Sequence, residues 1–289
     1  MHQFIDLPFG RVGAFPLCVG LGLSALVLLV LYGSSRCSFT AFQVNERLVP
    51  ALPFCLLFGV AFSGLTETFF HDGIRAVFRH PFGCGVNYFG WFIGCVIFLS
   101  AFGRLMRMSV RELLEVFVPA CLPAQAIGRI GCFLGGCCYG RPVALAWGVV
   151  YPDGSIPFSA YGAEPLFPVQ LCEAGWLFIV FVVVMTAVRQ GCRAGASLMA
   201  MGAGRFVLEF MRGDPRGSLF RDIPLSPAQC LSVALFVVGA LVWASVRSKT
   251  IQVGSGESPT ETSGEWHCHP DGIAMELREL DRYGRTGSN

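Results

Sequence analysis

Long apolar stretches separated by short polar or glycine-rich segments run through most of the chain. Each stretch approaches the length of about 20 residues that a helix needs to cross the hydrocarbon core of a bilayer. Seven are found, near residues 14–32, 48–63, 88–102, 113–127, 171–188, 196–211 and 225–246. The second, fourth and sixth are short or interrupted, the fourth by Pro119 and Pro123. The pattern predicts an all-α, polytopic integral membrane protein with about seven transmembrane helices.

The pattern changes after the last apolar stretch. From Lys249 to Asn289 the chain is rich in serine, glycine, threonine and charges of both signs. Such a composition buries too little apolar surface to build a core. We therefore expect two parts: a seven-span transmembrane core over residues 1–248, and a polar, flexible cytoplasmic tail over residues 249–289.

Basic side chains in short loops orient membrane proteins, because lysine and arginine accumulate on the cytoplasmic side. One set of loops carries Arg36, Arg104, Arg107, Arg111, Arg189, Arg193, Arg247 and Lys249. With seven spans, this distribution predicts that the N-terminus lies outside and the C-terminus in the cytoplasm. The opposite side nevertheless carries Arg129, Arg141, Arg212, Arg216 and Arg221. Arginines on the side that should lack them need another explanation.

The composition supports the membrane class and excludes others. Of the 289 residues, 54% are hydrophobic and 14% charged, whereas charged residues make up about 25% of a soluble domain. The net charge of +2 is too small for a nucleic-acid binder. The basic residues are 20 arginines and one lysine. Genomic bias would produce this ratio, but arginine also binds phosphate groups in a bidentate manner.

The 13 cysteines are an odd number scattered over apolar and loop segments, so they do not form a small disulfide framework. Most are expected to be small apolar fillers within the spans. Cys132, Cys137 and Cys138 lie close enough in the sequence to ligate a metal, but no second ligand cluster with suitable spacing follows. We therefore expect neither a metal nor a cofactor.

An ionisable residue inside an apolar segment is costly, which makes it a functional candidate. Arg129 follows the fourth apolar stretch and lies among five glycines between Gly128 and Arg141. These glycines let a backbone approach either an anionic ligand or a neighbouring helix. A permanent charge at the end of an apolar helix calls for an anionic partner, and a lipid phosphate is the obvious one at a membrane surface.

Two further groups of polar residues interrupt apolar stretches. Arg205, Glu209 and Arg212 are spaced i, i+4 and i+7, so a continuous helix would place them on one face. They predict either a polar cavity in the bilayer or an ion-pair ladder that only holds the helix. Gln170 and Glu173 open the fifth stretch. Glu173 could accept a proton, pair with an arginine, or be an acid favoured by the helix dipole.

These stretches resemble, in the same order, the motifs of the prolipoprotein diacylglyceryl transferase family. The resemblance includes the glycine-rich signature, a Trp-Gly-Val segment, Pro-x-Gln-x-x-Glu, Arg-Phe-x-x-Glu-x-x-Arg and Leu-Ser-x-x-Gln. The matching segments are Gly128–Arg141, Trp147–Pro152, Phe167–Glu173, Gly204–Asp214 and Leu225–Ser232. One such motif is weak, whereas five in the right order are specific.

The resemblance implies a multi-pass enzyme of the bacterial cytoplasmic (inner) membrane. Its substrates would be phosphatidylglycerol and the lipobox cysteine of a prolipoprotein signal peptide, and its environment membrane lipid, without nucleic acid. The diacylglyceryl group would move onto the cysteine sulfur as a thioether, and glycerol phosphate would leave. The residues expected to be catalytic are Arg129, Arg205, Glu209 and Glu173. The residues expected to bind lipid are Arg129, Gly131, Gly136, Gly140, Gln170, Arg205 and Arg212.

Several positions depart from the family pattern and keep two alternatives open. Phe89 stands where the family often has a histidine or tyrosine, and Phe167 where it usually has a histidine before proline. Cys132 and Cys137 replace polar or acidic residues of many members, and Cys172 stands where the family often has a tyrosine. These losses would suit a degenerate relative that binds lipid or signal peptide without catalysis. The second alternative is an unrelated membrane transporter, which is supported only by the interrupted glycine-rich segment.

Overall fold

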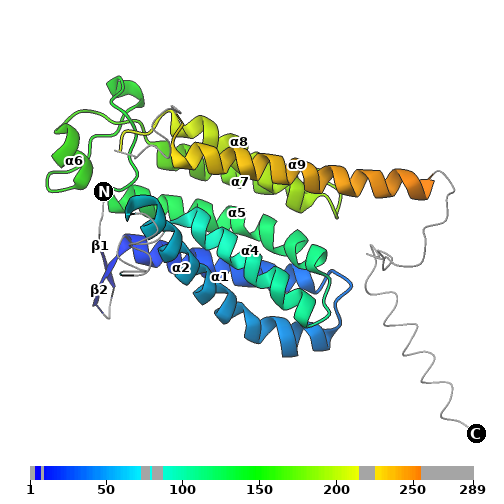
Figure 1. Ribbon diagram of the computed structural model, residues 1–289. Coiled ribbons are helices and arrows are strands. Elements are labelled where there is room, and N and C mark those ends of the chain that lie inside the picture. The colour runs from blue at the N-terminus through cyan, green and yellow to red at the C-terminus, as the bar shows by residue number, and fades with distance from the viewer. Residues whose placement is uncertain (1–3, 8–9, 73–78, 80–86, 215–224, 255–289) are drawn as a thin grey trace, which may run out of the picture.

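The apolar stretches form long helices that lie side by side in alternating directions (Figure 1). The computed structural model describes residues 4–7, 10–72, 79, 87–214 and 225–254. The long helices are α1 (Ala14–Ser34), α2 (Val49–Asp72), α4 (Tyr88–Leu105), α5 (Val110–Gly135), α7 (Val169–Ala187), α8 (Arg193–Glu209) and α9 (Pro227–Gly254). The shorter elements are strands β1 (Phe4–Leu7) and β2 (Gly10–Gly13), the π-helical η1 (Gln43–Leu48), the 3₁₀ turn η2 (Leu145–Trp147) and α6 (Ile156–Tyr161).

Six of the described helices are long and apolar enough to cross a membrane. They are α1, η1 continued into α2, α4, α5, α7 and the part of α9 up to Val246. Helix α8 has 17 residues, so its length of about 26 Å falls a little short of a hydrocarbon core of about 30 Å. The all-α, polytopic membrane fold is confirmed, and the count of seven crossings and the orientation stay predictions.

Helix α5 lies at the centre of the molecule. It packs against α1 and α4 on one side and against α7 and α8 on the other, and α9 covers α8 (Figure 1). Leu99 of α4 and Phe117 of α5 belong to the apolar core on the first side, and Leu122 of α5 and Leu177 of α7 to the core on the second. Helix α5 therefore joins the two sides of the bundle.

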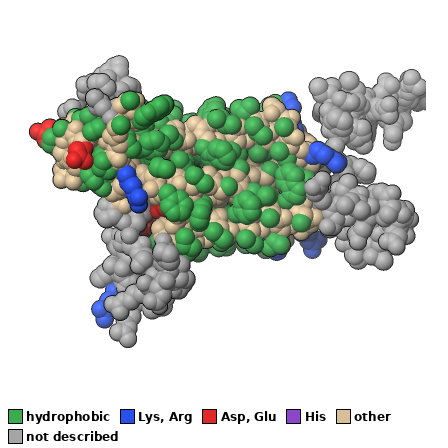
Figure 2. Space-filling model, turned by 90° about the horizontal axis from the view of Figure 1, so that it is seen from above, with side chains coloured by type: hydrophobic (Ala, Val, Ile, Leu, Met, Phe, Trp, Pro, Cys, Tyr) green, Lys and Arg blue, Asp and Glu red, His purple; other side chains and the backbone are tan. Residues whose placement is uncertain are grey.

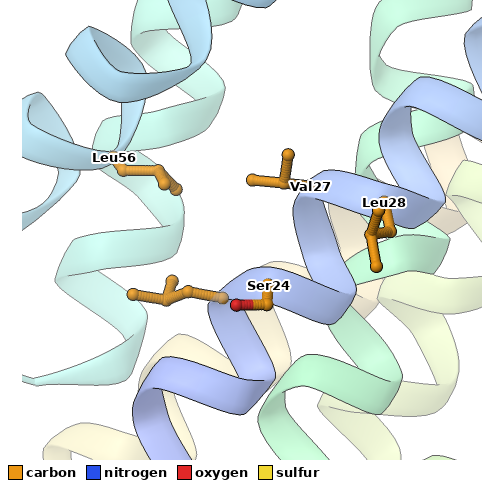
Figure 3. A pocket seen from close by; sticks show the side chains of 5 residues that line it. Ser24, Val27, Leu28 and Leu56 are labelled. Carbon is orange, nitrogen blue, oxygen red and sulfur yellow. The ribbon is translucent and has the colours of Figure 1, made fainter.

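The face of the bundle seen in Figure 2 is apolar along its length, and the charged side chains on it lie towards its ends. Large side chains such as Leu28, Leu57, Ile179 and Leu241 are more than half exposed. Exposed apolar side chains of this size on a soluble protein would form an aggregation-prone patch, whereas in a bilayer they meet lipid. Helix α1 also borders an apolar groove of about 390 Å³, lined by Leu23, Ser24, Val27, Leu28 and Leu56 (Figure 3).

Glycine allows α1 and α5 to pack closely. A Cβ atom at Gly22 of α1 would lie 2.7 Å from the carbonyl oxygen of Ala124 in α5. Likewise, a Cβ atom at Gly131 of α5 would lie 2.7 Å from Cβ of Cys18 in α1. The small residues near Gly131 therefore serve close packing between two helices, one of the two roles that the sequence allowed.

Buried carboxylates join the helices at one end of the bundle. The antiparallel hairpin of β1 and β2 lies at the other end (Figure 1). Glu115 of α5 accepts hydrogen bonds from the backbone N–H groups of Arg193 and Ala194, at 2.5 and 3.0 Å. These N–H groups begin α8 and have no partner within the helix, so the carboxylate caps it from a neighbouring element. Glu112 accepts from the Ser38 hydroxyl at 2.6 Å. The arginine-rich loops that the sequence assigns to one side of the membrane therefore meet at one end of the molecule.

Three helix ends differ from the sequence-based prediction. The fourth helix continues to Gly135 rather than ending near Ile127, because the glycines there pack against α1 instead of opening a loop. The second continues to Asp72, and the last to Gly254, past the expected boundary at Lys249. Arg216, Arg221 and the tail beyond Gly254 lie outside the described residues.

Candidate functional site

A chain of buried ion pairs links three helices at the end of the bundle that carries α6. The Arg129 guanidinium of α5 lies 3.0 Å from Oε1 of Glu173 on α7. Oε2 of Glu173 lies 3.2 Å from the Arg205 guanidinium of α8, which in turn lies 2.6 Å from Glu209. The Glu173 and Arg205 side chains are only 3% and 4% exposed, whereas Arg129 is 13% exposed. We call these four residues, Arg129, Glu173, Arg205 and Glu209, the ladder. Arg129 is its most exposed member.

The acids of this ladder are held by neutral polar groups as well. Gln125 of α5 donates to Oε1 of Glu173 at 3.2 Å. The hydroxyl of Ser226, just before α9, donates to Glu209 at 2.9 Å. Each carboxylate thus accepts from an arginine and from a neutral donor. Two arginines and two glutamates balance in charge, which lowers the large cost of burying each charge alone.

Arg212 lies beyond the continuous helix that the spacing argument assumed. Helix α8 ends at Glu209, and the backbone N–H groups of residues 210–212 donate to carbonyls three residues earlier. Arg212 therefore lies in a tighter turn after the helix, to which the i, i+4, i+7 geometry of an α-helix does not apply. Its side chain is 5% exposed and pairs in a bidentate manner with Asp214, at 2.8 and 2.7 Å.

The glycine-rich segment contributes a helix end and a packed loop. Arg129 lies inside α5 rather than at its end, because the helix runs on to Gly135. Gly136 ends the helix in a left-handed conformation, with φ of 71°, which glycine adopts without steric cost. A Cβ atom at Gly140 would overlap the carbonyl oxygen of Phe167. Packing thus accounts for Gly131 and Gly140, and the role of these glycines in lipid binding stays a prediction.

Gln170 fixes the loop after α5. Its side-chain amide donates to the carbonyl oxygen of Cys137 and to the hydroxyl of Tyr151, each at 2.9 Å. Tyr151 is buried, and this burial raises the pKa of its phenol. The sequence analysis did not name Gln125, and it included Tyr151 only within the segment Trp147–Pro152, since neither residue carries a charge.

Several buried polar atoms around the ladder make no hydrogen bond within the described part of the chain. They are Oε1 of Gln125, Oε1 of Gln170, Nε of Arg205, Nη1 of Arg212 and the hydroxyl of Tyr88. Buried polar groups in native proteins are nearly always satisfied, so unpaired ones indicate a place for water or a ligand. Two of these atoms belong to guanidinium groups, which suits an anionic ligand.

Tyr88 is the first residue of α4 and precedes Phe89. Phe89 is the position at which the family pattern often has a side chain that can exchange protons. The Tyr88 hydroxyl is buried without a hydrogen bond in the described part of the chain, and its ring stacks on Phe92. The structure therefore places a buried phenol directly beside Phe89. Phe89 instead packs among the partly buried apolar side chains of the core.

Comparisons with known proteins identify the family of the chain. Residues 3–245 match the family model described as prolipoprotein diacylglyceryl transferase. The chain is 27% identical, over 81% of its length and 90% of the relative's, to phosphatidylglycerol–prolipoprotein diacylglyceryl transferase 2 of Clostridium perfringens. It is 26% identical, over 91% and 95%, to the corresponding transferase of Halalkalibacterium halodurans.

A shorter alignment has higher identity. Against the transferase of Clostridium tetani the chain is 32% identical over 165 residues, which are 56% of this chain and 64% of that protein, just under two thirds of its length. Because the family model covers most of the chain, from the hairpin to the last helix, the similarity is not confined to the site. The chain therefore belongs to the prolipoprotein diacylglyceryl transferase family.

Proposed function

We propose that this protein catalyses the reaction for which its family is named, the first step of lipoprotein maturation. The sulfur of a prolipoprotein's lipobox cysteine attacks the glyceryl carbon that carries the phosphate of phosphatidylglycerol. A carbon–sulfur bond forms, the carbon–oxygen bond to phosphate breaks, and glycerol phosphate leaves with the electron pair. The thiol proton is lost in the process. The reaction would take place in the bacterial cytoplasmic membrane, where both substrates are embedded.

The observation that carries this proposal is the set of buried arginines at one end of the helices. Arg129, Arg205 and Arg212 come from α5, α8 and the turn after α8. Guanidinium groups keep their charge at any depth and match the geometry of phosphate oxygens. A buried arginine set at the end of apolar helices is where the phosphate of a lipid would lie if its acyl chains occupied the bilayer.

Within this set, Arg129 is best placed to hold the phosphate. It is the more exposed arginine of the ladder, and its partner Glu173 keeps a second arginine when Arg129 turns towards a ligand. An arginine aimed at the departing phosphate stabilises charge that develops in the transition state. The same positive charge favours the thiolate form of an incoming cysteine, which is the nucleophilic form.

Glu173 and Glu209 act in this proposal by positioning the arginines. Glu173 accepts from Arg129, Arg205 and Gln125, so its lone pairs are largely engaged. Glu209 is engaged by Arg205 and Ser226. The catalytic contribution of the two carboxylates then consists in fixing the two guanidinium groups before lipid arrives.

A second candidate function is binding of lipid or signal peptide without catalysis. The observation that favours it is Phe89, an apolar side chain at a position of the family pattern often held by a residue that exchanges protons. Tyr88 supplies a phenol beside it, which argues for retained chemistry. The two functions differ in whether a lipidated product forms.

Complementation separates the two functions. A bacterial strain is depleted of its own transferase, this chain is expressed, and prolipoprotein processing is followed together with the amount of membrane-inserted protein. Growth with diacylglyceryl-modified lipoprotein supports catalysis. Normal amounts of inserted protein without growth or modification would contradict it and favour binding alone.

A further inference from the structure

Three cysteines from the end of α5 and the following loop form a cluster of sulfur atoms. The Sγ atoms of Cys132, Cys137 and Cys138 all lie within 4.8 Å of one another. The described part of the chain has no other group of three such metal-binding side chains this close together. Cys132 is buried, and Cys137 and Cys138 are partly exposed, so an ion from outside can reach the cluster.

The fold holds these cysteines in place from several directions. The backbone N–H of Cys137 donates to the carbonyl oxygen of Cys132 at 3.0 Å, across the turn at Gly136. Gln170 of α7 fixes the carbonyl oxygen of Cys137 at 2.9 Å. Cys138 has φ of 59°, in the left-handed region that non-glycine residues rarely adopt. The loop is therefore fixed in a conformation that brings the three sulfur atoms together.

The spacing of the sulfur atoms suits a metal–thiolate complex. In a tetrahedral zinc site the sulfur atoms lie about 2.3 Å from the ion, which places them nearly 4 Å apart. The upper limit of 4.8 Å between the sulfur atoms accommodates that geometry, and the three cysteines are free rather than joined in a disulfide.

We propose that Cys132, Cys137 and Cys138 form a binding site for one thiophilic divalent metal ion of the zinc type. Three protein thiolates leave a fourth position for water or another ligand, as in zinc sites that are not purely structural. The sequence alone led us to expect no metal, because it shows one group of cysteines rather than two. The turn at Gly136 brings the three sulfur atoms of this one group together, so a second group of cysteines is not needed to supply three ligands. The site does not depend on the transferase reaction.

Zinc binding by the full-length protein tests this site. The protein is purified in detergent, reduced, freed of metal with a chelator and titrated with Zn²⁺ against a chromophoric competitor. We expect one tightly bound equivalent. Cys137→Ser and Cys138→Ser should each weaken binding by at least about tenfold, the effect of losing even a supporting contact in a metal site. Cys172→Ser and Cys230→Ser, which alter partly exposed cysteines outside the cluster, should bind as wild type.

A second measurement checks that the ion lies on these sulfurs. Bound Zn²⁺ should protect Cys137 and Cys138, but not Cys172, from alkylation by a maleimide, as read by peptide mass spectrometry. Cys137 and Cys138 are substituted because they are partly exposed, which leaves the packing of the buried Cys132 undisturbed. Loss of zinc binding in a variant that folds stably supports the site. A reduced wild type that binds no Zn²⁺, or an equivalent retained by both Cys137→Ser and Cys138→Ser, would overturn the proposal.

Discussion

At the scale of single residues, the site depends on which arginines are engaged and which can turn to a ligand. Arg205 is surrounded by Glu173 and Glu209, whereas Arg129 has one acidic partner and more exposure. Arg212 is held by Asp214 but keeps a buried nitrogen without a hydrogen bond in the described structure. A phosphate could therefore recruit Arg129 without leaving a buried carboxylate alone.

Arg129→Ala should abolish diacylglyceryl transfer while the protein still inserts at normal abundance. One charge-assisted contact to a transferring group contributes roughly 3–4 kcal/mol, or on the order of a hundred- to a thousandfold in rate. Arg129→Lys should restore only part of the activity, since an ammonium keeps the charge but loses the bidentate geometry. The measurement is a lipidation assay on matched amounts of membrane protein.

The matched control is Arg104→Ala. Arg104 is exposed near the opposite end of the bundle, and among the described residues its side chain donates to the carbonyl oxygen of Ser100 within its own helix. This variant should retain full activity. If Arg129→Ala or Arg129→Lys were nearly as active as wild type, Arg129 would not belong to the site.

Glu209→Gln should mainly reduce stability. Glutamine still accepts a hydrogen bond from Ser226 but no longer balances the buried charge of Arg205. Breaking a buried ion pair by removing one partner costs about 3–5 kcal/mol, so we expect lower yield and a lower melting temperature in detergent. The exposed Glu164→Gln serves as the control. Normal yield with reduced turnover would instead assign Glu209 a direct part in the chemistry.

The charged residues of the site could be found from the sequence, but their partners could not. Arg129, Glu173, Arg205 and Glu209 are conspicuous because a charge in an apolar segment is costly. Gln125 and Tyr151 are not, since a neutral side chain in a helix or loop gives no such signal. Their roles depend on contacts between elements distant in the sequence, which only the fold brings together.

At the scale of elements, α5 determines the arrangement of the site. It carries Arg129 and Gln125, packs against both halves of the bundle and ends in the loop with the cysteine cluster. The existence of this helix was predictable from its apolar residues despite Pro119 and Pro123. Its end was not, because glycines such as Gly131 are typical both of loops and of closely packed helices. The neighbour Cys18, distant in the sequence, decides between the two.

Two glycines of α1 give a matched test of this packing. A Cβ atom at Gly22 would lie 2.7 Å from the carbonyl oxygen of Ala124, whereas one at Gly20 would meet nothing within 4 Å. Gly22→Ala should therefore destabilise the protein by about 1–3 kcal/mol through overpacking. Gly20→Ala should be neutral or stabilise it by up to about 1 kcal/mol, because alanine favours helix. Thermal unfolding in detergent compares the two variants, and equal effects would contradict the close approach of α1 and α5.

At the scale of the whole molecule, the apolar outer surface and the polar site at one end fit an enzyme whose substrates lie in the bilayer. Composition alone predicted the membrane class, since so few charges could not cover a soluble protein of this size. The alternating helix directions also follow from the apolar pattern (Figure 1). Whether α8 spans the bilayer depends on how the membrane adapts to a helix of 17 residues, which no sequence pattern specifies.

The C-terminal tail should be dispensable. The part of the chain that matches the family ends at residue 245, and α9 ends at Gly254. A truncation after Gly254 should insert and transfer diacylglyceryl groups at close to the wild-type rate, because the tail's composition cannot build a core. Membrane fractionation together with the lipidation assay provides the measurement. A truncated protein that inserts well but has lost activity would assign the tail a function.

The most direct test of the proposed reaction is transfer by the purified protein alone. The protein is reconstituted with phosphatidylglycerol and a synthetic signal peptide that contains a lipobox cysteine, and the peptide is analysed by mass spectrometry. We predict a diacylglyceryl thioether on the cysteine and release of glycerol phosphate, with no product from a peptide that has serine in its place. A folded, reconstituted protein that leaves the cysteine peptide unmodified would contradict the central claim.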